Sequence, residues 1–147
     1  MDEKPGVQIR PARTADAGEL SRLTSQLGYP ASSEAMRGRL EHILSSPTDQ
    51  LLVAVGSQGL LGWIHGFRIQ LLESEYRVEI GGLIVDESCR RQGVGRQLVQ
   101  ALETWAGEQG VAELGVRCRV EREESHRFYE SLGMTATKTQ RVFRRRL

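Results

Sequence analysis

The stretch from Glu79 to Trp105 constrains the fold more strongly than any other part of this chain. It begins with an apolar run that predicts a strand, continues through a short basic loop with two glycines, and ends in a helical pattern. The first N–H groups of a helix lack intrahelical partners and carry partial positive charge, so this order favours an anion such as phosphate at the helix start. Gly93 and Gly95 would let the backbone come close to that anion. Three cations surround the same loop, namely Arg90, Arg91 and Arg96.

Two familiar phosphate-binding loops do not match this stretch. The loop lacks the Gly-Lys-Ser/Thr ending of a P-loop, and the residues after Gly95 do not supply the third glycine of a dinucleotide-binding fingerprint. For two glycines and several arginines alone, an ordinary surface turn is the alternative interpretation. The identity of the loop therefore has to come from its wider pattern.

The loop resembles the acyl-CoA loop of the GNAT N-acyltransferase superfamily, whose pattern R/Q-x-x-G-x-G/A appears here as Arg90-x-x-Gly93-x-Gly95. A second segment, 125–134, is similar to the family's A-x-x-F-Y-E-x-L-G-F, with Ser125 in place of Ala and Met134 in place of Phe. Arg122 stands where many members carry an Asn, so no Asn contact to CoA is implied here. The resemblance covers nearly the whole chain.

The remaining sequence alternates between strand and helix patterns. Strands are predicted at 7–10, 51–55, 60–72, 76–85 and 111–120, with one or two more in 134–147. A first helix is predicted between a cap at Thr14 and a stop at Gly28, and a second between Ser32 or Ser33 and Pro47. Two further helices are predicted at 94–109 and 123–132.

These elements predict the topology of one sheet. Hairpin-linked strands run antiparallel, whereas the helix after the glycine loop makes a right-handed parallel crossover to the next strand. The prediction is a single GNAT-like domain over 1–147 of the α+β class, with a mixed, mostly antiparallel twisted sheet, helices on both faces and one parallel βαβ crossover.

Composition narrows the classes of protein that the chain can represent. With 147 residues, 39% hydrophobic, 27% charged and a net charge of +1, it is typical of a folded domain. The near-neutral charge favours neither nucleic acid nor a membrane surface as a partner, and no apolar run is long enough to span a bilayer. A charged start without an apolar signal region favours the cytoplasm. Cys89 and Cys118 have no metal-ligand spacing and are predicted to be free thiols.

The C-terminal run Arg141–Leu147 is basic and by itself could indicate nucleic-acid binding. Because the whole chain is nearly neutral and lacks a recognition motif, we instead expect a solvated strand edge with Val142 and Phe143 turned inward. Its arginines could add affinity for the adenosine end of CoA.

The resemblance implies acetyl-CoA as the acyl donor and no metal. In the family, the glycine loop positions the diphosphate, and the pantetheine arm fills a gap between two splayed parallel strands. The residues expected to bind the donor are Leu83, Ile84 and Val85 on the strand and Arg90, Arg91, Gln92, Gly93, Val94, Gly95 and Arg96 in the loop. Gly81 and Gly82 indicate a bulge, which could turn the Leu83 N–H toward the thioester carbonyl, or they make room for a neighbouring side chain.

Two side chains are the predicted catalytic groups. Glu79 is the candidate base for the amine proton, acting through water, because an amine with a pKa of about 10.4 is protonated at neutral pH; a solvated carboxylate at a strand end is the alternative. Tyr129 is the candidate acid for the CoA thiolate, whereas Phe128 beside it is expected in the core. The three histidines, His42, His65 and His126, lie on separate elements without ligand spacing and are interpreted as ordinary polar residues.

The resemblance implies an N-acetyltransferase that moves an acetyl group to a primary amine of a small molecule by direct attack, with aminoglycoside-like and aminoalkylphosphonate-like amines among the classes. Glu73, Glu75 and Tyr76 lie in a region that borders the acceptor site in the family, although an acidic solvated loop explains them equally well. A protein or peptide N-acetyltransferase, a non-catalytic acyl-CoA-binding sensor and a scaffold subunit are the alternatives. Dimers are common among similar proteins, which makes a homodimer one expectation.

Overall fold

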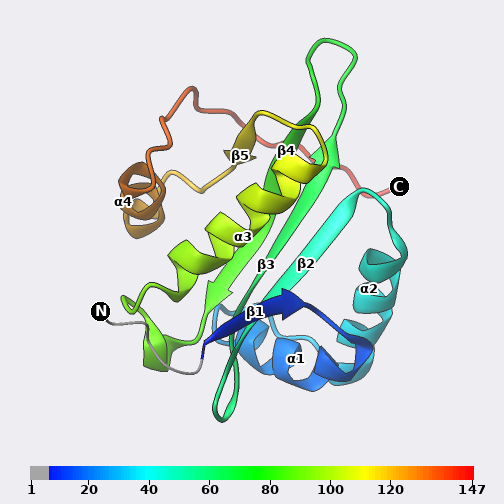
Figure 1. The fold of residues 1–147 in the computed structure, drawn as a ribbon. Helices are drawn as coiled ribbons and strands as arrows, with labels where there is room; N and C mark the ends of the chain where they lie inside the picture. Colours follow the sequence, from blue (N-terminus) through cyan, green and yellow to red (C-terminus); the bar gives the residue numbers. More distant parts are fainter. Residues whose placement is uncertain (1–6) are drawn as a thin grey trace. The chain divides into compact units, whose positions relative to one another are not determined.

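A computed structural model describes residues 7–147 of the protein. The chain divides into two compact units, Met1–Val116 and Arg117–Leu147. Within the described residues, the first unit contains a five-stranded sheet whose strands lie in chain order (Figure 1). The strands are β1 (Gln8–Pro11), β2 (Asp49–Gly56), β3 (Gly59–Ile69), β4 (Arg77–Val85) and β5 (Leu114–Val116). The helices are η1 (Thr14–Asp16), α1 (Ala17–Ser25), α2 (Ser33–Ser45), η2 (Glu87–Cys89) and α3 (Val94–Glu108), with α4 (Glu123–Ser131) in the second unit.

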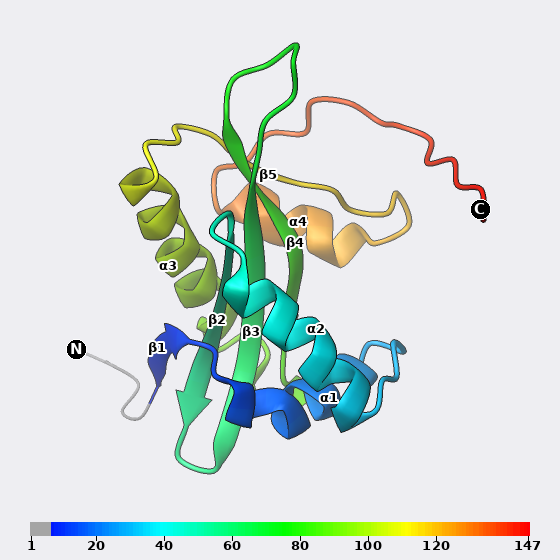
Figure 2. The same cartoon turned by 90° about the vertical axis from the view of Figure 1, so that its right-hand side faces the viewer.

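The sheet is mixed, as predicted. The pairs β1–β2, β2–β3 and β3–β4 are antiparallel, whereas α3 connects β4 to β5 and these two strands run parallel. Helix α3 covers one face of the sheet, and α1 and α2 cover the other (Figure 2). The predicted α+β class, with one parallel crossover and helices on both faces, is confirmed. That residues 1–147 form a single domain stays a prediction.

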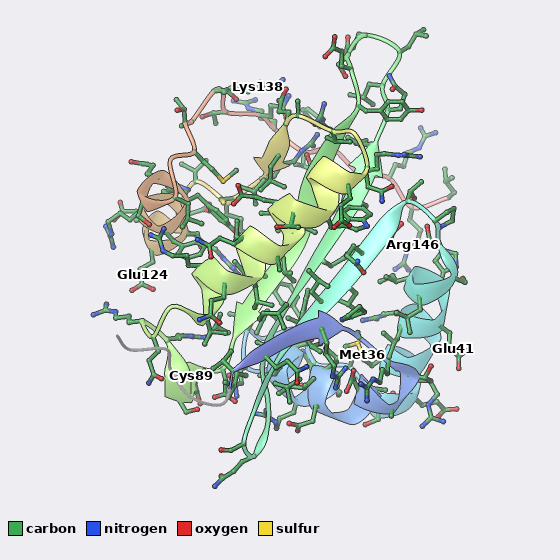
Figure 3. The ribbon with its side chains drawn as sticks, in the orientation of Figure 1. Met36, Glu41, Cys89, Glu124, Lys138 and Arg146 are labelled. Atoms are coloured by element: carbon green, nitrogen blue, oxygen red, sulfur yellow. The ribbon has the colours of Figure 1, made fainter. Side chains whose placement is uncertain are left out.

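An apolar layer holds α1 and α2 against the sheet. Leu23 of α1, Leu40 of α2 and Val53 of β2 are buried in one cluster. Met36 turns toward this cluster from α2, whereas Glu41 points away from it (Figure 3). The alternation of apolar and charged residues along α2 thus fixes which side of the helix faces the strands.

Helix α3 packs closely on the opposite face. Leu98 and Leu102 are fully buried. A Cβ atom at Gly62 would lie 3.2 Å from Leu98 Cδ1, and one at Gly66 would lie 2.5 Å from Leu102 Cδ1. The two glycines therefore let α3 approach β3, and this packing fixes the start of α3 beside the end of β4.

The predicted helix starts are confirmed except for α1. Ser32 Oγ accepts a hydrogen bond of 3.0 Å from the backbone N–H three residues later, which caps α2. Thr14 does not cap α1, because it opens the short η1 turn that precedes the helix. Instead, the Asp16 carboxylate accepts a hydrogen bond of 2.8 Å from the Arg13 N–H and pairs with Arg10. The helices predicted at 94–109 and 123–132 agree with α3 and α4 to within one residue.

Two predictions for the later part of the chain are wrong. The strand predicted at 111–120 is limited to the three residues of β5, and no strand forms within 134–147, all of which the structure describes. Val142 and Phe143 are 72% and 85% exposed and do not turn inward. Weak alternation forms a strand only where a neighbouring edge pairs with it, and no described strand pairs with this segment.

Residues 7–147 were expected to contain no membrane span, no disulfide and no metal-ligand cluster. No helix in this range is both long and apolar enough to cross a membrane. Cys89 and Cys118 are not joined in a disulfide, as predicted. Within the same range, no group of three or more His, Cys, Asp or Glu side chains is arranged to hold a metal ion.

Candidate functional site

The second half of β4 has a free edge. Residues 78–80 pair with Leu114–Val116 of β5. From Gly82 to Val85 the strand keeps its antiparallel partner β3, but no described strand pairs with its other side. Such an edge presents unpaired backbone N–H and C=O groups to an extended ligand. The end of pairing after residue 80 fits the gap between parallel strands that the resemblance implies.

The predicted bulge in β4 is confirmed. His65 pairs with Gly82 and Gly66 pairs with Ile80, so Gly81 has no partner in β3. A Cβ atom at Gly81 would lie 3.0 Å from His65 Nδ1, and one at Gly82 would lie 2.7 Å from the ring of Trp63. Both glycines therefore face the same side of the sheet. Neighbouring residues of a strand do so where a bulge adds one residue to that strand and none to its partner.

The loop between η2 and α3 turns sharply at two residues. Arg91 has a φ of 65° and Gly93 a φ of 84°, both in the left-handed region. A Cβ atom at Gly93 would meet no atom within 4 Å, so the backbone conformation and not crowding requires glycine there. Gly93 is exposed, whereas Gly95 is buried in the first turn of α3. The turn is therefore not covered by its own side chains.

The start of α3 is suited to an anion. Among the described residues, no side chain caps this helix end and no acidic residue lies in its first turn. Helix N–H groups and the macrodipole there favour negative charge. Arg90, Arg91 and Arg96 are exposed around it, and Arg90 Nε donates a hydrogen bond of 3.4 Å to the Val85 carbonyl at the end of β4.

Asp86 fastens the loop to the rest of the first unit. The carboxylate accepts hydrogen bonds from Arg22 Nη1 at 2.7 Å and from the Ser88 N–H at 2.9 Å. Arg22 of α1 also pairs with Glu19. The hydrogen bonds, first of all the one from Arg22, lower the pKa of Asp86 to about 2. In Figure 3, Cys89 lies on the same segment between β4 and α3, where it is buried.

Glu79 lies within β4 and not at its start, because the strand begins at Arg77. It stands opposite Phe67 in β3, and its Oε1 lies 3.9 Å from Arg77 Nη2. Alternation along β4 puts Glu79 and Gly81 on one face, and the bulge turns Leu83 to the opposite face. The proposed roles of Glu79 and of the Leu83 N–H stay predictions.

Asp49 and His65 form a hydrogen-bonded pair on the same face. His65 Nε2 lies 2.7 Å from Asp49 Oδ2. Ser46 Oγ and Thr48 Oγ1 donate hydrogen bonds of 2.8 and 3.1 Å to Asp49 Oδ1. Burial by itself would raise the pKa of Asp49, but the hydrogen bonds from these three side chains outweigh it and lower that pKa. The carboxylate is therefore ionised and held at both oxygens.

This pair was not predicted, because a bulge changes the register of the β2–β3 hairpin. Counted from the two-residue turn after Gly56, His65 would stand opposite Gln50, and Asp49 would point to the other face. The register shifts between Ala54 and Val55, which places His65 opposite Leu51. A shift of one residue moves a side chain to the other face, and no residue type in the hairpin marks it.

The second unit places Tyr129 on α4. Its ring packs edge-on against Phe128, with the ring centroids 5.0 Å apart, and both residues are half-buried, so Phe128 is not in the core. Burial and, to a smaller extent, Cys118 raise the pKa of Tyr129, which keeps the phenol protonated. His126 Nε2 lies 2.8 Å from the Arg119 carbonyl in the same unit.

The β3–β4 connection carries the three residues that, according to the family resemblance, border the acceptor site. Glu73, Glu75 and Tyr76 are all exposed. The Arg68 guanidinium stands over the Tyr76 ring, 5.0 Å from its centroid. This contact packs a β3 side chain against one end of the connection, and the two carboxylates are open to solvent.

Comparison with known proteins connects this geometry to one family. The sequence model of the acetyltransferase (GNAT) family matches residues 18–134. An aminoglycoside N(6')-acetyltransferase type 1 of Serratia marcescens is 26% identical over 85% of this chain and 89% of its own length. The protein of the same name from Klebsiella aerogenes is 27% identical over the full length of both chains. An uncharacterized N-acetyltransferase of Chlorobaculum tepidum is 32% identical over 74% of this chain and 65% of its own length.

Solved structures agree with the fold. The aminoglycoside N-acetyltransferase AAC(6')-Iy in complex with CoA superposes with a TM-score of 0.87 at 21% identity, covering all of both chains. A transcriptional regulator from Bacillus halodurans superposes with a TM-score of 0.85 at 22% identity, over 94% of this chain and 99% of that one. Because proteins with such different descriptions share the architecture, the likeness establishes the fold and not the substrate.

Proposed function

The chain belongs to the acetyltransferase (GNAT) family, and from this premise we propose that it transfers an acetyl group from acetyl-CoA to a primary amine of a small molecule. The observation that carries the proposal is the free edge of β4, which leads directly to an exposed glycine loop at an uncapped helix start. One feature can hold an extended amide-containing arm, and the other can hold a diphosphate. Their order along the chain matches the order of these groups in acetyl-CoA.

The residues that would hold the donor come from both features. The backbone of Leu83, Ile84 and Val85 would bind the arm, and the loop from Arg90 to Arg96 would bind the diphosphate. Bound acetyl-CoA supplies an activated thioester. Glu79 is the base that the sequence predicts for the amine proton, and the protonated phenol of Tyr129 would donate a proton to the leaving sulfur.

The acceptor that we propose is a cationic amine of the aminoglycoside class, with aminoalkylphosphonates as a second class. The two relatives named as aminoglycoside N(6')-acetyltransferases support the first class. The exposed carboxylates of Glu73 and Glu75 would attract a polycation over the distance of a Debye length, about 10 Å at 0.1 M salt. Aminoalkylphosphonates carry negative charge as well, so the same carboxylates favour them less.

Two measurements on the full chain test the proposal. Calorimetry with acetyl-CoA should show one binding site, and a thiol-release assay should show turnover with at least one member of a panel of aminoglycosides, aminophosphonates, polyamines and peptides with free N-termini. Binding without thiol release would favour an acyl-CoA sensor. Release with peptides alone would favour the protein or peptide N-acetyltransferase. Absence of binding would contradict the proposal and favour a scaffold role.

A further inference from the structure

The Asp49–His65 pair lies where the free edge of β4 begins. A Cβ atom at Gly81 would lie only 3.0 Å from His65 Nδ1, so the imidazole stands directly over the backbone of this exposed bulge residue. The side chains of His65 and Asp49 keep 21% and 19% exposure. The ring is therefore neither sealed in the core nor free to rotate on the surface.

The two ring nitrogens of His65 have different surroundings. Nε2 is engaged by the Asp49 carboxylate, which Ser46 and Thr48 hold in place. Among residues 7–147, Nδ1 has no hydrogen-bond partner. A carboxylate on one nitrogen fixes the tautomer in which that nitrogen carries the proton, and it stabilises the imidazolium when the other nitrogen accepts a proton. Nδ1 is thus the basic atom.

We propose that His65, oriented by Asp49, is the base that takes the proton from the acceptor amine at the bulge of β4. This inference rests on the proposed function. The amine nitrogen forms a bond to the carbonyl carbon, and the carbon–sulfur bond breaks with its electron pair on sulfur. Of the two protons that an ammonium substrate loses, one passes through His65 Nδ1 to solvent and the other ends on the leaving sulfur. His65 touches the amine in this scheme, whereas Asp49 is a positioning residue.

Other charged groups lie on the elements that pack near the His65 ring. On the same face, β4 presents Glu79 and Arg77, whose side chains lie 3.9 Å apart. Helix α1 directs Glu19 and Arg22 to the far end of β3. The charged and titratable residues of α2, which packs on β2, are all exposed: Glu34, Arg37, Arg39, Glu41 and His42. Asp49 is therefore the charge in contact with the ring, and Glu79 is the competing base.

The test compares the wild type with variants at His65, Asp49, His42 and Glu79, using acetyl-CoA and whichever panel amine the wild type acetylates fastest. His65→Gln keeps a donor near the Nε2 position but has no base, so kcat should fall by about 10²-fold, while the Kd of acetyl-CoA stays unchanged. The acidic limb of the kcat/KM pH profile should disappear. Asp49→Asn should reduce kcat as well, because the amide can favour the wrong tautomer. His42→Gln, at an exposed histidine of α2, is the control and should keep full activity.

Nitrogen-15 NMR of the imidazoles gives a readout that needs no turnover. In the wild type without substrate, His65 should carry its proton on Nε2 at high pH, and this preference for Nε2 should weaken in Asp49→Asn. Wild-type kcat and an intact acidic limb in His65→Gln would overturn the inference and leave the proposed function standing. Loss of that limb in Glu79→Gln instead would overturn it in favour of Glu79. A wild type that releases no thiol with any amine would remove the proposed function itself.

Discussion

Among single residues, Gly93 has the most specific requirement in the candidate site, since its φ is 84° and a Cβ atom would contact nothing within 4 Å. Alanine there should lower the free energy of unfolding by about 1–2 kcal/mol, the cost of a left-handed non-glycine residue. It should also weaken acetyl-CoA binding in calorimetry. The control is Gly38→Ala inside α2, which should raise stability by up to about 1 kcal/mol. Unchanged stability and affinity in Gly93→Ala would contradict the loop geometry.

Tyr129 provides a second test on a single atom. Because burial raises the pKa of the phenol, the hydroxyl is protonated at neutral pH and can act only as an acid. Tyr129→Phe should lower kcat by about 10²-fold and leave the Kd of acetyl-CoA nearly unchanged. Stopped-flow thiol release together with calorimetry separates the two quantities. Equal turnover in both proteins would remove Tyr129 from the mechanism.

The structural role of a single residue was predictable from the sequence where that residue type strongly prefers one local backbone structure. Glycine at a sharp turn and a serine hydroxyl at a helix start are two examples. The structure has both, at Gly93 and at Ser32. The Asp49–His65 pair was not predictable, because it joins residues 16 positions apart across a hairpin whose register is shifted by a bulge. Side-chain type says nothing of such a shift.

Between elements, the contact of α1 with the end of β4 depends on Asp86. Its pKa is lowered to about 2 from 3.8, so its contribution to stability is present above pH 3.8 and is lost as the pH falls toward 2. A pKa lowered to about 2 corresponds to about 2 kcal/mol of stability. Unfolding of the wild type and of Asp86→Asn should differ most above pH 4 and converge by pH 2. A difference that is constant with pH would show that the carboxylate charge is not what holds α1 to the loop.

The order of elements was predictable because strand and helix patterns alternate clearly from Val7 to Glu108. The prediction of strands failed where pairing with a neighbouring strand decides whether a segment becomes a strand. The run 111–120 is apolar enough for a strand, but only 114–116 lie opposite the paired half of β4. The tail 134–147 alternates weakly, and no described strand pairs with it. Its sequence alone could not show that Val142 and Phe143 are exposed and not part of a strand edge.

At the scale of the molecule, the net charge of +1 implies that donor binding depends on local and not on overall charge. Arg96→Gln, at an exposed position in the first turn of α3, should weaken acetyl-CoA binding by about two- to fivefold and reduce its dependence on salt. Arg37→Gln on α2 changes the net charge equally and should have no effect in the same calorimetric titrations. An equal loss of affinity in both variants would indicate that the loop does not bind the donor.

The family establishes an acyltransferase, and the proposed mechanism depends on where the donor binds. Amide hydrogen exchange of the full chain, followed by NMR with and without saturating acetyl-CoA, tests this directly. We predict that the amides of 81–85 that point away from β3, together with those of 93–96, exchange rapidly in the free protein and become protected in the complex. Binding that leaves these amides unprotected would contradict the proposed donor site at the free edge of β4 and the start of α3.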